Sequence, residues 1–176
     1  VTDELTSFNS DGFTTNNNNG MNENNRPYVA WNWLAANGTA SNTAGSINST
    51  VSVNTTAGFS IVSFDLTSLT GNQTVGHGLN TAPKVVITKR RSGGAGDWTS
   101  YFGAIGNSYL VLNKTTAGAT SSSFMNNTAP TSSVFTVGDP SWWGADPFIA
   151  YCFSEKQGFS KFGSYTGNGS SNGAFI

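Results

Sequence analysis

The feature that most constrains this chain is the spacing of its turn-forming residues. Gly, Asn or Ser interrupts nearly every window of ten residues, which leaves no room for a long amphipathic helix. Between the interruptions lie short runs in which β-branched and aromatic residues alternate with polar ones. Short alternating runs separated by turn clusters are typical of an all-β sandwich or barrel, and this is the predicted fold class.

The predicted strands are residues 28–34, 59–66, 84–89, 98–104, 109–113, 133–137, 148–153 and 159–165. In residues 84–89 the apolar side chains are consecutive, Val85-Val-Ile87, which would suit a central strand. Two stretches are poor in core residues. Residues 16–25 hold seven Asn and predict an exposed loop, and residues 35–56 predict a connector with one weak edge strand.

The composition excludes several classes of partner. The 176 residues carry a net charge of −1 and only 10% charged side chains, against about 25% in typical domains. The eight basic residues are scattered, so no surface for nucleic acid or an anionic membrane is expected. No apolar run approaches the roughly 20 residues that span a bilayer. A single Cys and a single His exclude disulfide frameworks and multi-cysteine or multi-histidine metal centres.

The chain also repeats itself. Pro27-Tyr-Val-Ala-Trp-Asn-Trp33 aligns with Pro147-Phe-Ile-Ala-Tyr-Cys-Phe153, and Phe13-Thr14 aligns with Phe135-Thr136. Further along, Gly58-Phe-Ser60 aligns with Gly158-Phe-Ser160 in the same block order. The repeat predicts three parts. Residues 1–56 form the end of one repeat with a connector strand, 57–158 a complete sandwich repeat, and 159–176 the start of a further repeat that completes the same sandwich.

Several of these blocks resemble a repeated module of virion-associated proteins of tailed bacteriophages, notably marine ones. The blocks are Tyr28-Val-Ala-Trp-Asn-Trp33, Ala57-Gly-Phe-Ser-Ile-Val62, the run from Val75-Gly-His-Gly to Ile87-Thr-Lys89, Asn127-Thr-Ala-Pro-Thr-Ser-Ser-Val-Phe135, and Gly158-Phe-Ser-Lys-Phe-Gly-Ser-Tyr-Thr-Gly-Asn168. The resemblance implies an antiparallel β-sandwich of the jelly-roll, concanavalin-like or laminin-G-like kind. It implies a structural or appendage protein and carries over no catalytic residue.

The residues that could perform catalysis lack the neighbours that catalysis needs. His77 lies between two glycines, with no carboxylate within ten residues on either side, which favours a turn residue over a general base. Cys152 lies in the middle of a predicted strand without a nearby cation, which favours burial over a reactive thiolate. No two carboxylates share the strand spacing typical of sandwich glycosidases. We therefore expect no enzymatic activity and no cofactor.

One loop, Asp139-Pro-Ser-Trp-Trp-Gly-Ala-Asp146, is the candidate binding site. Trp142 and Trp143 could stack on a sugar, anchor a protein interface or fold back over the end of the core. Asp139 and Asp146 could bind Ca²⁺ with nearby Asn side chains, or simply be solvated loop acids; no metal site is assigned to them. These four residues are the predicted interface or glycan contacts.

The sequence thus leads to two hypotheses. The first is a non-enzymatic bacteriophage virion structural protein, located in the virion and acting through protein–protein contacts as a capsid-decorating or appendage component. Its expected partners are other capsid or tail proteins and further copies of the chain, for example in a trimer. The alternative is a lectin-like module of a tail fibre or head fibre that binds a host surface glycan.

Overall fold

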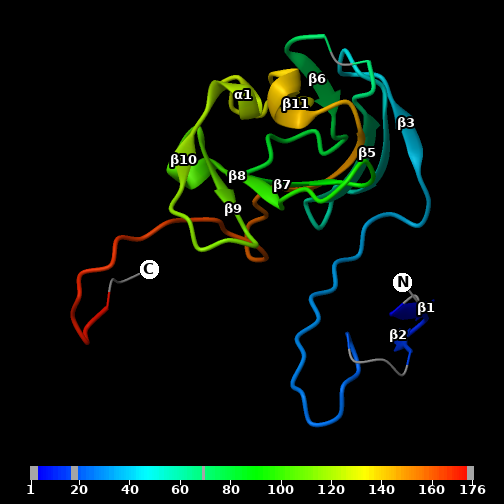
Figure 1. The fold of residues 1–176 in the computed structure, drawn as a ribbon, viewed down its shortest axis with the longest axis vertical. Helices are drawn as coiled ribbons and strands as arrows, with labels where there is room; N and C mark the ends of the chain where they lie inside the picture. Colours follow the sequence, from blue (N-terminus) through cyan, green and yellow to red (C-terminus); the bar gives the residue numbers. More distant parts are fainter. Residues whose placement is uncertain (1–3, 17–19, 69, 174–176) are drawn as a thin grey trace. The chain divides into compact units, whose positions relative to one another are not determined.

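A computed structural model describes residues 4–16, 20–68 and 70–173 of the chain. The chain divides into two compact units, Val1–Trp33 and Leu34–Ile176. In the first unit, β1 (Leu5–Asn9) and β2 (Gly12–Thr15) form an antiparallel hairpin in which Asn9 lies opposite Gly12 (Figure 1). The repeat boundaries predicted at 56/57 and 158/159 stay predictions.

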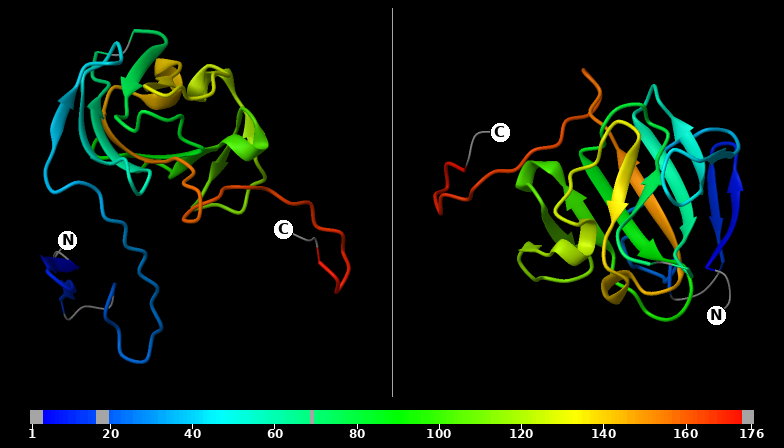
Figure 2. Two further views of the ribbon diagram at one scale, coloured as in Figure 1. Left: turned by 180° about the vertical axis from the view of Figure 1, so that it is seen from behind. Right: turned by 90° about the horizontal axis from the view of Figure 1, so that it is seen from above.

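The second unit is built on one antiparallel sheet of eight strands, in the order β10-β9-β8-β7-β12-β5-β4-β3. Figure 2 shows these strands from above and from behind. Their bounds are β3 (Ala40–Asn42), β4 (Ser49–Asn54), β5 (Phe59–Asp65), β7 (Val85–Arg90), β8 (Thr99–Phe102), β9 (Ser108–Val111), β10 (Ala119–Thr120) and β12 (Pro147–Phe153).

Strand β12 lies near the middle of this sheet and pairs with β5 on one side and β7 on the other. Its side chains alternate because successive residues of a strand point to opposite faces. Phe148, Ala150 and Cys152 are buried, whereas Ile149 and Tyr151 are only partly covered. The sheet therefore has an inner face, which carries Phe148, Ala150 and Cys152 into the core, and an outer face, which carries Ile149 and Tyr151.

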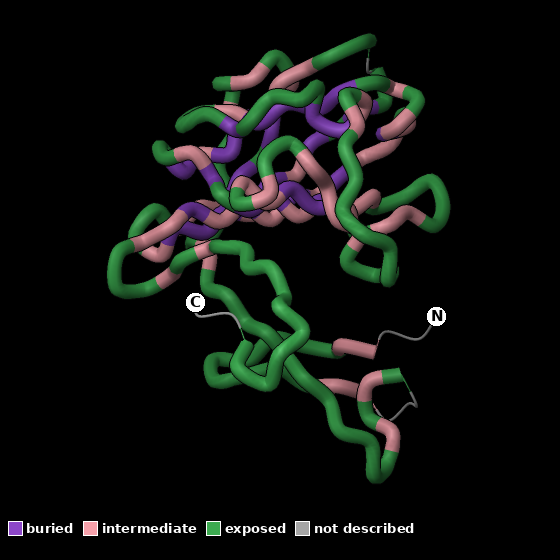
Figure 3. The backbone as a smooth tube through the Cα atoms, turned by 90° about the vertical axis from the view of Figure 1, so that its left-hand side faces the viewer, coloured by how far each residue is buried: buried purple, intermediate pink, exposed green. Residues whose placement is uncertain are grey.

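A second layer covers the inner face. It consists of the strand pair β6 (Gln73–Gly76) and β11 (Val134–Val137) with the one-turn helices α1 (Ser122–Met125) and α2 (Pro140–Trp143). A short 3₁₀ helix, η1 (Gly103–Ile105), follows β8. Figure 3 shows the buried stretches gathered in this sandwich. The core residues contributed by the covering layer are Val75, Phe124, Met125, Phe135, Val137 and Trp143. The predicted all-β sandwich is thus confirmed.

Three local predictions were wrong. Residues 28–34 and 159–165 form no strand, although an isolated bridge joins Lys156 to Ser160. The predicted connector, residues 35–56, instead contributes two strands, and β4 lies between β3 and β5 rather than at an edge. These predictions failed because a segment becomes a strand only where a neighbouring strand can pair with it, and the alternation of its own residues does not reveal that neighbour. Val51 of β4 reaches the core even though most of its neighbours in sequence are small and polar.

In the described part of the chain, no helix has the length and apolar character needed to cross a membrane.

Candidate functional site

The predicted tryptophan loop is folded into helix α2. Asp139 caps this helix by accepting a hydrogen bond from the Ser141 N–H at 2.7 Å. Hydrogen bonding from the Ser141 side chain and from its backbone N–H holds the pKa of Asp139 below its usual range. Trp143 is buried and donates its Nε1–H to the Phe124 carbonyl at 2.7 Å. Trp142 is partly buried, with its ring 4.8 Å from that of Tyr109. Of the two indoles, only Trp142 offers surface to a ligand.

Asp146 is also engaged within the sandwich. Its carboxylate lies 3.3 Å from the Arg90 guanidinium, and Arg90 donates a second hydrogen bond to the Trp143 carbonyl. This link fastens the end of α2 to β7. Asp139 and Asp146 belong to no group of three or more metal-ligating side chains among the described residues. Within the protein the two acids thus have separate partners, Ser141 for Asp139 and Arg90 for Asp146.

His77 and Cys152 are held in the interior. The His77 Nδ1 accepts from the Leu79 N–H at 3.2 Å, which places the ring proton on Nε2, where it is donated to the Thr131 carbonyl at 3.1 Å. Burial lowers the pKa of His77, partly offset by the hydrogen bond to Thr131. Burial raises the pKa of the Cys152 thiol far above its ordinary value. Neither group is presented to a substrate.

The outer face of the eight-stranded sheet is a candidate contact surface of the sandwich. One cross-strand row runs from Ile61 through Tyr151, Ile87 and Ser100 to Leu110. Apart from the buried Ser100, these side chains are only partly covered. This row is the apolar part of the outer face that solvent reaches.

Trp98 stands at the edge of this row. It precedes β8, and its ring stacks on Tyr151 with centroids 6.2 Å apart and planes inclined by 26°. The Lys89 ammonium lies 5.7 Å from the centre of the indole. Trp98 is 37% exposed and Leu112, two residues after Leu110, is 49% exposed. Trp98, Tyr151 and Leu112 are hereafter called the Trp98 surface.

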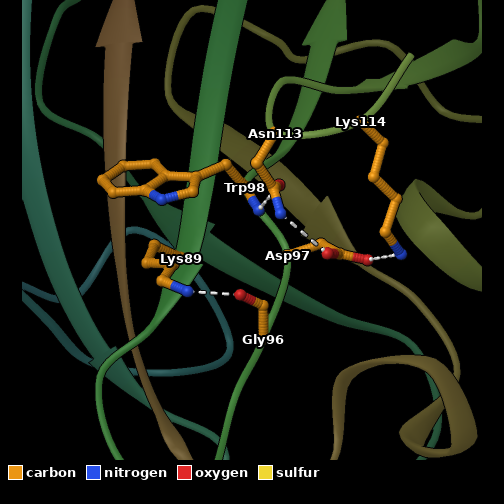
Figure 4. Close-up of polar contacts among 6 residues, drawn as sticks. All are labelled: Lys89, Gly96, Asp97, Trp98, Asn113 and Lys114. Atoms are coloured by element: carbon orange, nitrogen blue, oxygen red, sulfur yellow. Dashed lines mark hydrogen bonds and ion pairs between the residues drawn. The ribbon is translucent and has the colours of Figure 1, made fainter. Parts of the chain in front are cut away.

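Polar side chains hold the backbone around Trp98 in place (Figure 4). Asn113 accepts from the Trp98 N–H at 2.9 Å and donates to the Asp97 carboxylate at 3.0 Å. Lys114 pairs with the same carboxylate at 2.6 Å, and Lys89 donates to the Gly96 carbonyl. The hydrogen bonds from Lys114 and Asn113 lower the pKa of Asp97. The result is a fixed aromatic side chain bordered by charged and amide groups.

This arrangement suits recognition. A rigid indole with a polar border is typical of protein interface anchors, since Trp supplies a large contact area at a small entropic cost. Sequence reasoning placed Trp98 only at the start of a strand. The sequence carried no signal for its role, because Trp98-Thr-Ser-Tyr-Phe102 does not alternate between apolar and polar residues. Only the burial of Tyr101 in the core shows that Trp98, Ser100 and Phe102 belong to the outer face.

Comparison with known proteins gives a family match over the whole chain. The family model that matches residues 1–176 is described as a domain of unknown function, DUF7483. No curated protein and no solved structure matches the chain.

Proposed function

The chain belongs to the DUF7483 family, and we propose that it is a non-enzymatic structural protein of a bacteriophage virion, acting through protein–protein contacts as a capsid-decorating or appendage component. The virion part of this proposal rests on the sequence blocks that resemble phage modules. The observation that carries the contact part is the partly exposed apolar row on the outer face of the sheet, with Trp98 at its edge.

The internal positions of the reactive side chains support a non-catalytic role. The His77 ring nitrogens are both used by backbone groups, and the Cys152 thiol is fully buried. Both side chains thus help to specify the sandwich.

The test is a peptide map of purified particles of the phage that encodes this chain, with the copy number determined by quantitative mass spectrometry. Copies in the hundreds would identify a decorating protein, and a few to a few tens of copies an appendage. Absence of the chain from particles would contradict the proposal.

The same particles test the contact surface. The Trp98→Ala variant should fold normally, because Trp98 lies outside the core, but be incorporated at a level at least several-fold lower. The matched control is Tyr165→Ala, which removes another exposed aromatic ring from the same unit. Equal incorporation of both variants would show that the Trp98 surface is not the contact.

A glycan-binding function is the second candidate. The observation that favours it is the border of Asp97, Asn113 and Lys114 beside the exposed indole, which offers both hydrogen-bond donors and acceptors. Incubating the purified chain with a glycan array tests it directly. Binding that is lost in Trp98→Ala and kept in Tyr165→Ala would support this function, and an array without any bound glycan would argue against it.

A further inference from the structure

Residues 27–33 carry a strand sequence without a strand's environment. Tyr28, Val29 and Trp31 are 50%, 80% and 78% exposed, and the whole segment lies outside every strand that the structure describes. Three large apolar side chains so close together in an extended segment are costly to leave in water. The exposed apolar side chains of residues 27–33 therefore favour a partner that buries them.

The internal repeat shows what kind of neighbour it fits. Residues 27–33 align with β12, residues 147–153, with identical Pro and Ala at the first and fourth positions. Strand β12 is enclosed on both sides, with Cys152 opposite Ser60 of β5 and Val86 of β7. A segment with the sequence pattern of β12 therefore fits between one strand of the β5 type and one strand of the β7 type.

Residues 27–33 match both faces of β12 position by position. Tyr28, Ala30 and Asn32 correspond to the inward-facing Phe148, Ala150 and Cys152. Val29, Trp31 and Trp33 correspond to the outward-facing Ile149, Tyr151 and Phe153. Ala150 is fully buried, so the alanine shared by both segments fits a position where the covering layer leaves room for little more than a methyl group.

The segment before residues 27–33 follows the same order. Phe13-Thr14 of β2 aligns with Phe135-Thr136 of β11, the strand that covers the core and precedes β12 in the chain. The Phe135 side chain is fully buried in the sandwich, whereas Phe13 is 36% exposed. Residues 13–33 thus repeat the sequence of two successive strands of the sandwich, β11 and β12, one from each layer.

We infer that residues 27–33 form the β12 strand of another sandwich of this kind in the same polypeptide, inserted between strands of the β5 and β7 types. Residues 13–15 supply its β11 strand. The inference rests on the repeat, on the matched faces and on the exposure of the segment. On this inference, the hairpin unit belongs to a neighbouring sandwich. The same polypeptide then runs from that sandwich directly into the one formed by the second unit.

A transplant into the full chain tests whether the segment can act as β12. Four substitutions, Phe148→Tyr, Ile149→Val, Tyr151→Trp and Phe153→Trp, give β12 the sequence of residues 27–33 while keeping Cys152 in the core. We expect cooperative thermal unfolding, with a Tm within about 10 °C of the parent by circular dichroism.

The matched control shifts the same sequence by one position, so that residues 148–153 carry the sequence of residues 29–34. This puts Trp in place of the buried Ala150 and Cys152, and the variant should lose its cooperative transition. Failure of the four-substitution variant to fold, or equal folding of the shifted one, would overturn the inference.

A tandem protein tests the pairing itself. Residues 34–131, which supply every element of the sandwich except β11, α2 and β12, are joined ahead of the complete chain. Amide exchange at Val29–Asn32 should then be at least about 100-fold slower than in the single chain, because these groups become part of a ladder. Ala30→Pro in the tandem should restore fast exchange. Equal exchange rates in the tandem and the single chain would refute the pairing.

Discussion

At the scale of single residues, His77 couples the fold to pH. The folded chain lowers its pKa chiefly by burial, so the neutral ring is favoured in the native state and the proton is bound more readily after unfolding. Stability should therefore be highest above pH 6.5, the ordinary pKa of His, and should fall as the pH drops toward the lowered value.

The expected loss is at most about 1.4 kcal/mol per pH unit in the free energy of unfolding. Urea unfolding between pH 7.5 and 5.5 measures it, in a range where the carboxylates remain ionised. His77→Gln should flatten this dependence even though it lowers stability throughout. A slope that is the same in both proteins would show that another group is responsible.

Cys152 gives a second residue-scale prediction. Its thiol is fully buried in β12, and its raised pKa leaves almost no thiolate at neutral pH. A thiol reagent such as Ellman's reagent should label the native chain only through unfolding, and should label it at once in denaturant. Rapid labelling of the native protein, at the rate of a free thiol, would contradict the burial of Cys152.

At the scale of elements, helix α2 gives its two tryptophans different tasks. Trp143→Phe removes the hydrogen bond to the Phe124 carbonyl, which keeps a second one from the Gly138 N–H, and it leaves a cavity because the new ring is smaller than the buried indole. Together these losses should cost about 1–3 kcal/mol in the free energy of unfolding. Trp142→Phe keeps a ring against Tyr109 in a partly exposed position and should cost less than about 1 kcal/mol. Chemical denaturation of both variants checks the order, and equal losses would contradict it.

The same helix explains why the two neighbouring tryptophans lie in different environments, with Trp143 folded back over the core, which is one of the three alternatives expected from the sequence. Two neighbours in a strand point to opposite faces, whereas one helical turn with Asp139 at its N-terminus can direct Trp143 into the core and place Trp142 beside Tyr109. The loop could be recognised from its Pro and Gly, but a four-residue helix has too little periodicity to be predicted.

At the scale of the whole molecule, the sandwich should be stable without the first unit. The buried hydrophobic cluster is drawn entirely from the second unit, between Val51 and Cys152. A chain that begins at Leu34 should therefore unfold cooperatively, with a Tm within about 3 °C of the complete chain. Calorimetry measures this, and a loss of the transition would show that the hairpin unit supports the sandwich.

The sequence alone determined the class of fold and most of the sheet. Turn residues limit the segment length and alternation sets the two faces, so the strands near residues 59–66, 84–89 and 148–153 could be predicted from local chemistry. The burial of Cys152 was predicted from its place in the middle of a strand without a nearby cation, and the structure confirms it.

Only the tertiary structure decided which strand-like sequences become strands and which aromatic rings stay exposed. Residues 27–33 and 147–153 share a pattern, yet only the second lies between β5 and β7. Trp98 and Trp143 are the same residue type, yet one borders the outer face and the other fills the core. The physical reason is that a β-strand obtains its backbone hydrogen bonds and its burial from neighbours distant in sequence, which local patterns do not reveal.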